Sequence, residues 1–329
     1  MRVLVVGGTL FIGKLLVKEL LKAGHAVSIL HRKPGHDFGK RVAELIGDRN
    51  DPSSFKAAVE GREFDVVFDN VYDWERGTTA EQVGATAMAC GKLQRYIFMS
   101  SVAAYGDGLN HQEGDGLAID THPDSYVRNK AQSERVLFRL HQRHGLPVVT
   151  LRPPYVYGPE NPFYREQFFW DRFAAGRPVL VPGDGRRLMQ FVFVKDLVDA
   201  CIKAMDCPGA VGHAFNVANP KPVTQTELIQ ALAAAAKYQP SMVHVPRENL
   251  LAAGGHPMRA PLYFGVYYDM PPITMVTQKI QRVLKWQSTP FDQGLKESYK
   301  WYQKNSNGAP KNFDFEDKML AAYGPKTHG

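Results

Sequence analysis

The glycine-rich stretch at the start of the chain constrains the fold more than any other feature. Four apolar residues, 3–6, run without a polar break and stop at Gly7 and Gly8, and leucines then recur at helical spacing across residues 15–21. This pattern predicts a buried strand, a tight turn and an amphipathic helix. Because glycine permits backbone angles that a side chain forbids, the turn can be sharp and can leave the helix N-terminus open.

The open helix N-terminus behind this turn suits a phosphate group. Its free N–H groups and the positive end of the helix dipole attract an anion such as the pyrophosphate of a dinucleotide. Gly13 would let the helix pack closely on the strand, but Leu10 stands where a further glycine is expected. The motif alone therefore leaves open a strand and a helix that bind no ligand. The candidate phosphate-binding loop is Gly7, Gly8, Thr9, Leu10, Phe11, Ile12 and Gly13.

Strands and helices alternate through the rest of the N-terminal half. Strands are predicted over residues 26–30, 42–46, 65–68, 96–99 and 147–151, and helices from residue 52, over 78–93 and over 125–144. This alternation predicts an α/β fold, a doubly wound parallel sheet with helices on both faces. Ligands of such sheets bind at the carboxyl ends of the strands, where these turns lie.

The regular pattern ends after Arg152, where four prolines and seven aromatic residues crowd positions 153–170. A short strand and helix around residues 190–197 resume the first pattern. We therefore expect a dinucleotide-binding domain over residues 1–158, to which the chain returns at about 189–219, and a smaller C-terminal substrate-binding region over 159–329.

Composition and charge narrow the class of protein. With 329 residues, 44% of them hydrophobic and 22% charged, the chain resembles an ordinary soluble globular protein. No apolar run is long enough to span a bilayer, and Met1 leads directly into the first strand, so we expect a cytoplasmic protein without membrane association. Three cysteines without Cys-x-x-Cys spacing suggest core thiols and no metal site. The net charge of +7 attracts phosphate-bearing molecules or nucleic acid, but the basic residues are scattered, which disfavours a nucleic-acid groove.

The segment after the second predicted strand bears on the choice of dinucleotide. An acidic residue there accepts hydrogen bonds from the ribose 2′-hydroxyl of NAD, whereas a basic one pairs with the 2′-phosphate of NADP. This chain has His31, Arg32 and Lys33 and no acid. The segment favours NADP, with a solvated basic turn as the alternative.

Tyr126 and Lys130 lie four residues apart on a predicted helix, so their side chains share one face. A phenol is a weak base, but a neighbouring ammonium and an oxidised nicotinamide favour the phenolate. Such a group can take a proton from a carbinol as hydride leaves for the cofactor. Ser101, at the end of a predicted strand, is placed to hydrogen-bond the same oxygen. Because Tyr-x-x-x-Lys also occurs by chance on amphipathic helices, a structural role remains open.

Further segments follow one another in the order and at the spacing of a single enzyme family. They are residues 47–49 (Gly-Asp-Arg), 100–106 (Ser-Ser-Val-Ala-Ala-Tyr-Gly), 126–130, 151–159 (Leu-Arg-Pro-Pro-Tyr-Val-Tyr-Gly-Pro), 191–197 and 294–302. Together with the opening turn they resemble the extended short-chain dehydrogenase/reductases, the NAD(P)-dependent epimerase/dehydratase family. The resemblance covers nearly the whole chain and implies a Rossmann domain.

The resemblance also assigns roles to individual residues. It implies that Ser101, Tyr126 and Lys130 are the catalytic residues. It places Asp48 and Arg49 beside the adenine and Val71 along the dinucleotide. The cofactor-binding set is then the loop 7–13, His31, Arg32, Asp48, Arg49, Val71, Tyr126, Lys130, Pro153 and Tyr155. A homodimer formed through the helices that carry Lys92 and Tyr126 is a further expectation from the family.

One branch of the family is especially similar. The non-glycine at Leu10, the Gly-Asp-Arg segment and the closing residues 312–319 resemble the branch that contains the chloroplast stem-loop RNA-binding proteins, along with bacterial members described only as epimerases. RNA binding or cleavage on the same fold is therefore the competing hypothesis. The complete set of Ser101, Tyr126 and Lys130 favours the enzyme.

Two positions depart from the nucleotide-sugar epimerases. Tyr155 stands where those enzymes commonly place an asparagine that holds the diphosphate, and Met189-Gln190 stands where they place an arginine. Arg165, Arg186 and Arg187 are near enough in sequence to substitute, because guanidinium forks suit phosphate, although each also fits a solvated surface.

These features predict an NAD(P)-dependent oxidoreductase or epimerase that acts on a secondary alcohol of a sugar or nucleotide sugar, with NADP favoured over NAD. If the ketone stays bound and hydride returns to its other face, the net reaction is epimerisation. If the ketone leaves, the protein is a dehydrogenase or reductase. A third interpretation is a protein that binds the cofactor and consumes no substrate.

Overall fold

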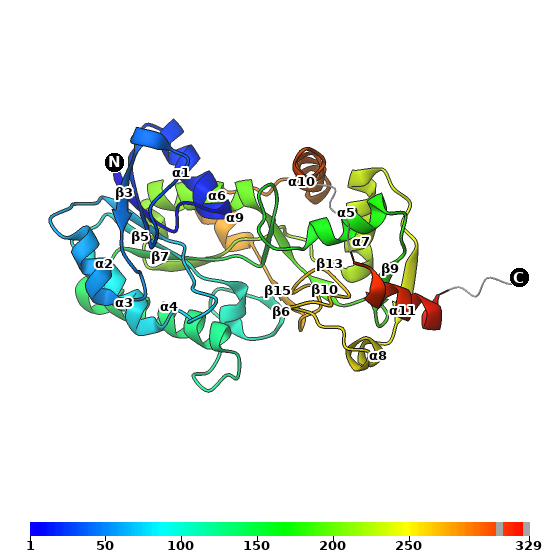
Figure 1. Ribbon diagram of the computed structural model, residues 1–329. Coiled ribbons are helices and arrows are strands. Elements are labelled where there is room, and N and C mark those ends of the chain that lie inside the picture. The colour runs from blue at the N-terminus through cyan, green and yellow to red at the C-terminus, as the bar shows by residue number, and fades with distance from the viewer. Residues whose placement is uncertain (307–311, 325–329) are drawn as a thin grey trace, which may run out of the picture. The chain divides into compact units, whose positions relative to one another are not determined.

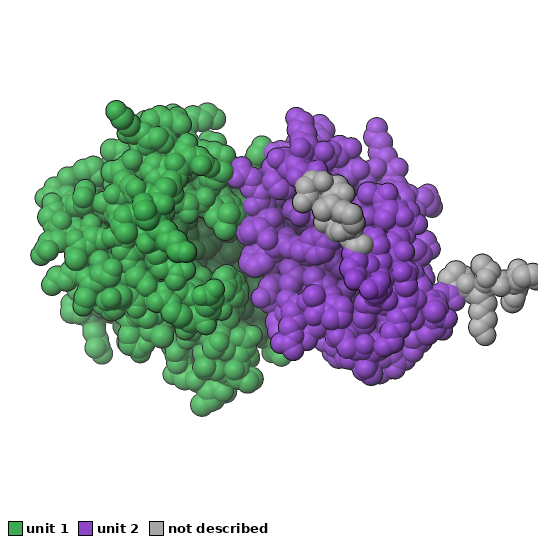
Figure 2. All heavy atoms as spheres, viewed as in Figure 1, with its two compact units in different colours: residues 1–156, 192–220, 273–288 green, residues 157–191, 221–272, 289–329 purple. Residues whose placement is uncertain are grey.

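The computed structural model describes residues 1–306 and 312–324 and divides the chain into two compact units. Unit 1 comprises residues 1–156, 192–220 and 273–288, and unit 2 comprises residues 157–191, 221–272 and 289–329 (Figure 2). The return to the first unit expected at 189–219 thus has a counterpart at 192–220. Residues 273–288, which the sequence analysis assigned to the smaller region, belong to unit 1.

The described residues of unit 1 form a seven-stranded sheet in the order β12-β7-β5-β4-β1-β2-β3, in which each neighbouring pair is parallel. The strands are β1 (Arg2–Val6), β2 (Ala26–His31), β3 (Val42–Ile46), β4 (Val66–Asp69), β5 (Arg95–Met99), β7 (Val148–Arg152) and β12 (His213–Asn216). This arrangement confirms the doubly wound parallel α/β sheet predicted from the alternating pattern.

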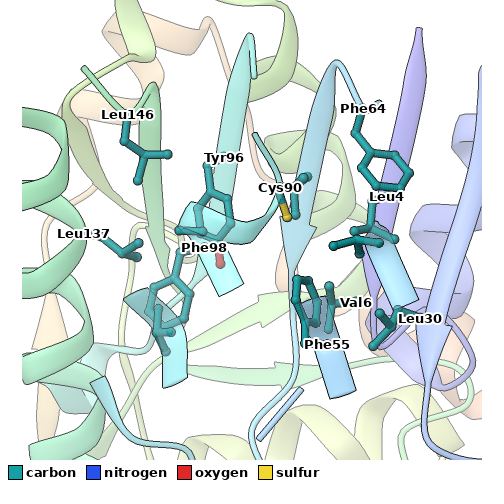
Figure 3. Close-up of a cluster of buried hydrophobic side chains, with 14 of the residues drawn as sticks. Leu4, Val6, Leu30, Phe55, Phe64, Cys90, Tyr96, Phe98, Leu137 and Leu146 are labelled. Atoms are coloured by element: carbon teal, nitrogen blue, oxygen red, sulfur yellow. The ribbon is translucent and has the colours of Figure 1, made fainter. Parts of the chain in front are cut away.

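Helices cover both faces of this sheet (Figure 1). The helices of unit 1 are α1 (Phe11–Lys22), α2 (Pro52–Val59), α3 (Ala80–Ala89), α4 (Ser125–His144), α6 (Val194–Asp206) and α9 (Gln278–Leu284). Helices α1, α6 and α9 pack together on one face, and α2, α3 and α4 on the other. Buried side chains of the strands, such as Leu4 on β1 and Phe98 on β5, meet Phe55 of α2 and Leu137 of α4 in a common core (Figure 3).

Local signals set the ends of the helices. Helix α4 has the predicted bounds because Asp124 accepts the N–H of Tyr126 at its start and Gly145 adopts a left-handed conformation (φ 69°) at its end. Helix α3 is shorter than predicted, because Thr79 and Gln82 form a capping box at its start and regular structure ends at Ala89.

Residues 273–288 return to unit 1 through specific contacts. Strand β15 (Ile273–Met275) pairs in parallel with β6 (Gly108–His111), which follows the short 3₁₀ turn Val102–Tyr105. Trp286 is fully buried, and its indole N–H donates to the carbonyl of Asp196 at 2.8 Å. The sequence analysis missed this return because three strand residues carry too little periodicity to identify a strand.

Unit 2 has its own small core. Its elements are α5 (Glu166–Ala174), β9 (Val179–Pro182), β10 (Leu188–Met189), β13 (Val223–Thr224), α7 (Gln225–Ala236), β14 (Met242–Val245), α8 (Arg247–Ala252), α10 (Phe291–Asn305) and α11 (Asp314–Tyr323), while β8 (Tyr155–Tyr157) and β11 (Phe191–Phe193) lie where the chain passes between the units. Phe168, Phe169 and Trp170 are buried in this core. Among the described residues, no helix is both long enough and apolar enough to cross a membrane.

Candidate active site

The turn between β1 and α1 has no room for side chains at two of its glycines. Gly7 adopts a positive φ of 84°, and a Cβ there would lie 2.4 Å from Cγ2 of Val71. A Cβ on Gly13 would lie 1.9 Å from the carbonyl oxygen of Gly7. The backbone of helix α1 therefore packs directly on the end of β1, and the predicted residue Val71 lies against the loop.

The N-terminus of α1 carries no side-chain cap. Leu10, the residue before the helix, makes no capping hydrogen bond and is 61% exposed. Phe11 follows with a φ of 43°, a strained conformation for a residue with a side chain, at a cost of about 1–3 kcal/mol. Uncapped N–H groups and local strain are both typical of a loop that binds a ligand.

The end of β4 adds an orphaned polar group beside this loop. Both side-chain polar atoms of Asn70 are buried and lack a hydrogen-bond partner within the described structure. Its neighbour Val71 contacts Gly7. Since a buried amide without partners is costly, a ligand that supplies donors and acceptors would stabilise this position. The glycine turn, the uncapped helix and Asn70 together fit a bound dinucleotide.

We expect Gly13→Ala to disrupt this loop. The added methyl group meets the carbonyl of Gly7, so the backbone must shift, and we expect a loss of about 1–3 kcal/mol in the free energy of unfolding. Affinity for NAD(P)H, measured by fluorescence titration, should fall with it. Gly116→Ala is the control, because no atom lies within 4 Å of a Cβ at Gly116. Unchanged cofactor affinity in Gly13→Ala would contradict this assignment.

The two residues expected beside the adenine have different environments. Asp48 is partly exposed, and its carboxylate accepts the N–H of Asn50 at 2.9 Å. Arg49 has a side chain only 3% exposed, and its guanidinium binds Asp69 at 2.5 Å. Asp69 also accepts the hydroxyl of Tyr96 at 2.7 Å. The side chain of Arg49 therefore joins the ends of β3 and β4 inside the protein, which leaves only its backbone to border an adenine.

The basic segment after β2 is held by two carboxylates. His31 Nε2 lies 2.7 Å from Oε1 of Glu44, and Nη1 of Arg32 lies 3.1 Å from Oδ2 of Asp73. The side chain of Arg32 remains 55% exposed. Arg32 is therefore in reach of a ligand at the carboxyl end of β2.

Tyr126 and Lys130 lie one turn apart on α4, next to the end of β5. The ammonium of Lys130 donates to the carbonyl of Met99 at 2.6 Å and lies 5.9 Å from the ring centre of Tyr126. Lys130 is buried, and this burial lowers its pKa to about 8 because the charged form is disfavoured. The nearby Asp69 opposes that effect. The structure thus brings the predicted phenol and amine together.

Ser101 lies just beyond β5, two residues after the carbonyl that holds Lys130. Its hydroxyl accepts the N–H of Ala103 at 3.1 Å and begins the 3₁₀ turn. Its hydroxyl hydrogen is still able to donate.

The loop after β4 covers the ring of Tyr126 with aromatic side chains that the sequence analysis did not identify. The indole of Trp74 stacks on Tyr126 with ring centres 4.8 Å apart and planes 24° apart. The ring of Tyr72 meets Tyr126 edge to face at 4.7 Å, and its hydroxyl accepts a hydrogen bond from Asn129. Trp74 itself is 57% exposed. The only sequence signal was the pair of aromatics in Tyr72-Asp73-Trp74 directly after a strand.

We expect Trp74→Ala to loosen the ring of Tyr126. An aromatic pair contributes about 0.5–1.5 kcal/mol beyond its buried area, so turnover should fall by about 3- to 10-fold while the fold persists. The check is kcat for Trp74→Ala against Trp74→Phe, which keeps a stacking ring and should recover most of the rate. Equal losses in the two variants would contradict this role.

A buried network of hydrogen bonds connects helix α4 to the strands next to the site. Glu134 on α4 is fully buried and accepts hydrogen bonds from Ser100, Thr150 and Arg152. Arg152 in turn donates to the hydroxyl of Tyr105 at 2.7 Å. Because these bonds tie β5, α4 and β7 together, they hold the helix that carries Tyr126 and Lys130 against the strand ends.

The other predicted residues are placed less specifically. The carbonyl of Pro153 accepts the N–H of Val102, and Tyr155 begins β8 half-buried. In unit 2, Arg187 binds Asp269 and the carbonyl of Met270, whereas Arg165 stacks on aromatic rings such as Phe163. Arg186 is exposed in the turn before β10. Their proposed contacts with substrate remain predictions. Among the described residues, no group of three or more His, Cys, Asp or Glu side chains could hold a metal ion.

The chain is similar in sequence to proteins of one known enzyme family. The sequence model of the NAD dependent epimerase/dehydratase family matches residues 3–218. The chloroplast stem-loop binding protein of 41 kDa b from Arabidopsis thaliana is 33% identical over 319 residues, which cover 91% of this chain and 78% of that protein.

Solved structures show the same fold at lower identity. The epimerase Mth375 from Methanothermobacter thermautotrophicus has a TM-score of 0.73 at 21% identity and covers 92% of each chain. The dTDP-glucose 4,6-dehydratase from Bacillus anthracis, solved in complex with NAD, has a TM-score of 0.75 at 17% identity and covers 94% of this chain and 98% of that one.

Proposed function

Because the chain belongs to the NAD-dependent epimerase/dehydratase family of enzymes, we propose that it transfers hydride between a nicotinamide dinucleotide and a secondary alcohol of a sugar or nucleotide sugar. The resemblance drawn from the sequence motifs is confirmed by the family match. The identity of the substrate alcohol and of the catalytic residues is part of our proposal.

The pairing of Tyr126 with the buried Lys130 carries the proposal. A bound nicotinamide would supply the hydride acceptor or donor. Tyr126 Oη would take the proton from the substrate hydroxyl in oxidation and return it in reduction. The positive charge of Lys130, 5.9 Å from the centre of the Tyr126 ring, favours the phenolate that accepts this proton. Ser101 Oγ would donate to the same substrate oxygen and hold it in place.

The proposed cofactor is NADP rather than NAD. Solved relatives of the fold, such as the dTDP-glucose 4,6-dehydratase named above, contain NAD. In this chain, however, residues 31–33 are all basic, and Arg32 is half exposed at the end of β2. A guanidinium at this place favours the 2′-phosphate of NADP over a plain ribose hydroxyl.

The substrate class and the setting of the enzyme are extensions of this proposal. Solved relatives are named for epimerases and for a dTDP-glucose dehydratase, which supports a sugar-like substrate. Tyr155 and Met189 stand where the family resemblance leads us to expect the asparagine and the arginine that hold a diphosphate, so the substrate need not carry that group. We propose that the protein forms a homodimer, as the family resemblance implies, and that it is cytoplasmic, as expected from the sequence.

Mass spectrometry of the small molecules released from the purified protein tests this proposal. We expect a nicotinamide dinucleotide, with NADP in excess of NAD. The released mixture, added to the protein with fresh NADP, should produce NADPH absorbance if it contains the substrate and the ketone product leaves the site, as in a dehydrogenase. A protein that binds neither dinucleotide at millimolar concentration would overturn the proposal.

The stem-loop binding relative favours one alternative, an RNA-binding or RNA-cleaving function. In that case affinity for a stem-loop RNA should fall steeply with salt, because phosphate contacts release counterions, and Tyr126→Phe should leave it unchanged. Two results together would support the enzyme over the RNA-binding protein. Turnover should depend on Tyr126, and the affinity for RNA should be no greater than that of an unrelated basic protein.

A further inference from the structure

Unit 2 contains a cavity of about 210 Å³ between the start of α5 and the end of α10. The proposed function assigns it no role. Asn305 and Ser306 at its rim are exposed, so the cavity opens to solvent. The rest of its wall consists of three aromatic residues, one amide and one carboxylate, which belong to Tyr164, Trp301, Tyr302, Gln167 and Asp171.

Asp171 places a negative charge in the wall of this cavity. The residue is 7% exposed, and its carboxylate accepts the hydroxyl of Tyr164 and, at 2.7 Å, that of Tyr302. Burial, together with the hydrogen bond to Asp171, raises the pKa of both phenols, so both hydroxyls stay protonated and donate. The neighbouring Arg172 binds Glu316 on α11. The two carboxylates and the guanidinium therefore remain negative as a group.

Most hydrogen-bond donors in the wall are already used. Both phenol hydroxyls donate to Asp171. The side-chain nitrogen of Asn305 donates to the carbonyl of Trp301 at 2.8 Å, and the N–H of Ser306 donates to the carbonyl of Tyr302 at 2.7 Å. The lone pairs left on the carboxylate, on the phenol oxygens and on the amide oxygen of Asn305 can only accept. A wall of this kind suits a cation better than an anion.

Three aromatic rings add a second attraction for positive charge. The hydroxyls of Tyr164 and Tyr302 meet on one carboxylate, so their rings flank Asp171. Trp301, which is partly exposed, precedes Tyr302 on α10 and lines the same cavity. The face of an aromatic ring attracts a cation, and quaternary ammonium groups are recognised in this way. A metal ion prefers several oxygen ligands of high charge, whereas this cavity has a single carboxylate.

We propose that this cavity binds an alkylated ammonium group, such as the trimethylammonium head of a small molecule. Asp171 would supply the opposite charge, and the rings of Tyr164, Trp301 and Tyr302 would contact the methyl groups. Pockets for drug-sized ligands measure about 300–1,000 Å³, so this smaller cavity suits a head group and not a whole nucleotide. The proposed hydride transfer does not depend on this site, because none of its residues is assigned to that reaction.

Titration with choline and with 3,3-dimethylbutan-1-ol tests the proposal, because the two probes have nearly the same shape and differ in charge. The methyl signal of each probe, followed by NMR in the presence of the full-length protein, gives its dissociation constant. We expect choline to bind about 10-fold more tightly than the neutral alcohol, since its charge interacts with both the rings and the carboxylate. Tetramethylammonium should compete with choline, and K⁺ at the same concentration should not.

Two variants separate the contributions of the charge and of the rings. Asp171→Asn removes the charge and keeps an acceptor for one phenol, so choline affinity should fall about 10-fold while affinity for the neutral alcohol stays the same. Trp301→Leu removes one ring at a partly exposed position and should weaken choline binding about 3- to 10-fold. The second variant keeps the test decisive if Asp171→Asn does not fold.

Asp292→Asn is the matched control. Asp292 lies in the first turn of α10, at the other end of that helix from Trp301, and its side chain is 68% exposed. Its loss removes the same charge and should leave choline affinity unchanged. Equal affinity of the wild-type protein for choline and the neutral alcohol would overturn the proposal. So would the absence of choline binding at millimolar concentration, or choline binding that neither Asp171→Asn nor Trp301→Leu weakens.

Discussion

Tyr126→Phe should lower kcat by about 10²- to 10⁴-fold, the usual contribution of a positioned general acid or base. The phenylalanine ring keeps the stacking with Trp74 and the edge contact with Tyr72, so the fold of the loop is expected to persist. What disappears is the hydroxyl that exchanges a proton with the substrate oxygen. Affinity for the dinucleotide should therefore change little.

Single-turnover measurement of NADPH formation or consumption would check this result, because it isolates the chemical step from product release. Tyr72→Phe is the control. It removes a hydroxyl that accepts a hydrogen bond from Asn129 on the same aromatic cluster, and its expected effect is less than about tenfold. If the two variants lose activity equally, the hydroxyl of Tyr126 has no special chemical role.

Lys130→Met should make the protein more stable and less active at once. The pKa of Lys130 is lowered from 10.5 to about 8 by burial, which corresponds to about 3 kcal/mol of destabilisation at neutral pH. Methionine removes that penalty and loses one hydrogen bond to Met99, worth about 1 kcal/mol. We expect a net gain of about 2 kcal/mol in the free energy of unfolding at pH 7. Turnover should fall by about 10²-fold or more, because the phenolate loses its neighbouring cation.

The pH dependence gives this prediction a definite sign. Between about pH 8 and 10.5 the unfolded chain keeps the lysine protonated while the folded protein does not. The unfolded state then binds more protons, so the stability of the wild-type protein rises with pH in this window. The difference in the free energy of unfolding between Lys130→Met and the wild-type protein should therefore become smaller as the pH rises through this window.

Denaturant unfolding at pH 7 and pH 9.5 measures that difference. Lys92→Met, at an exposed lysine, serves as the control and should show no such dependence. A Lys130→Met protein that is less stable than the wild type at pH 7 would show that the ammonium is better accommodated than its burial implies.

Much of the fold could be predicted because its signals are local. The run of apolar residues 3–6 before Gly7 specifies a strand and a turn, and the clashes at Gly7 and Gly13 explain why glycine is needed at those positions. Helix α4 has a polar cap at Asp124 and a glycine at its end, so its bounds, and the shared face of Tyr126 and Lys130, follow from spacing alone.

The rest depended on which strand ends lie side by side, and that is a property of the folded sheet. The sequence placed Arg49 beside the adenine, but it did not indicate that Asp69, twenty residues later, binds the buried guanidinium of Arg49. Trp74 covers Tyr126 although 52 residues separate them, and Arg32 meets Arg76 only through Asp73. Periodicity reports which face of an element is apolar. It carries no information about which side chains from distant loops converge, because that depends on strand order and packing.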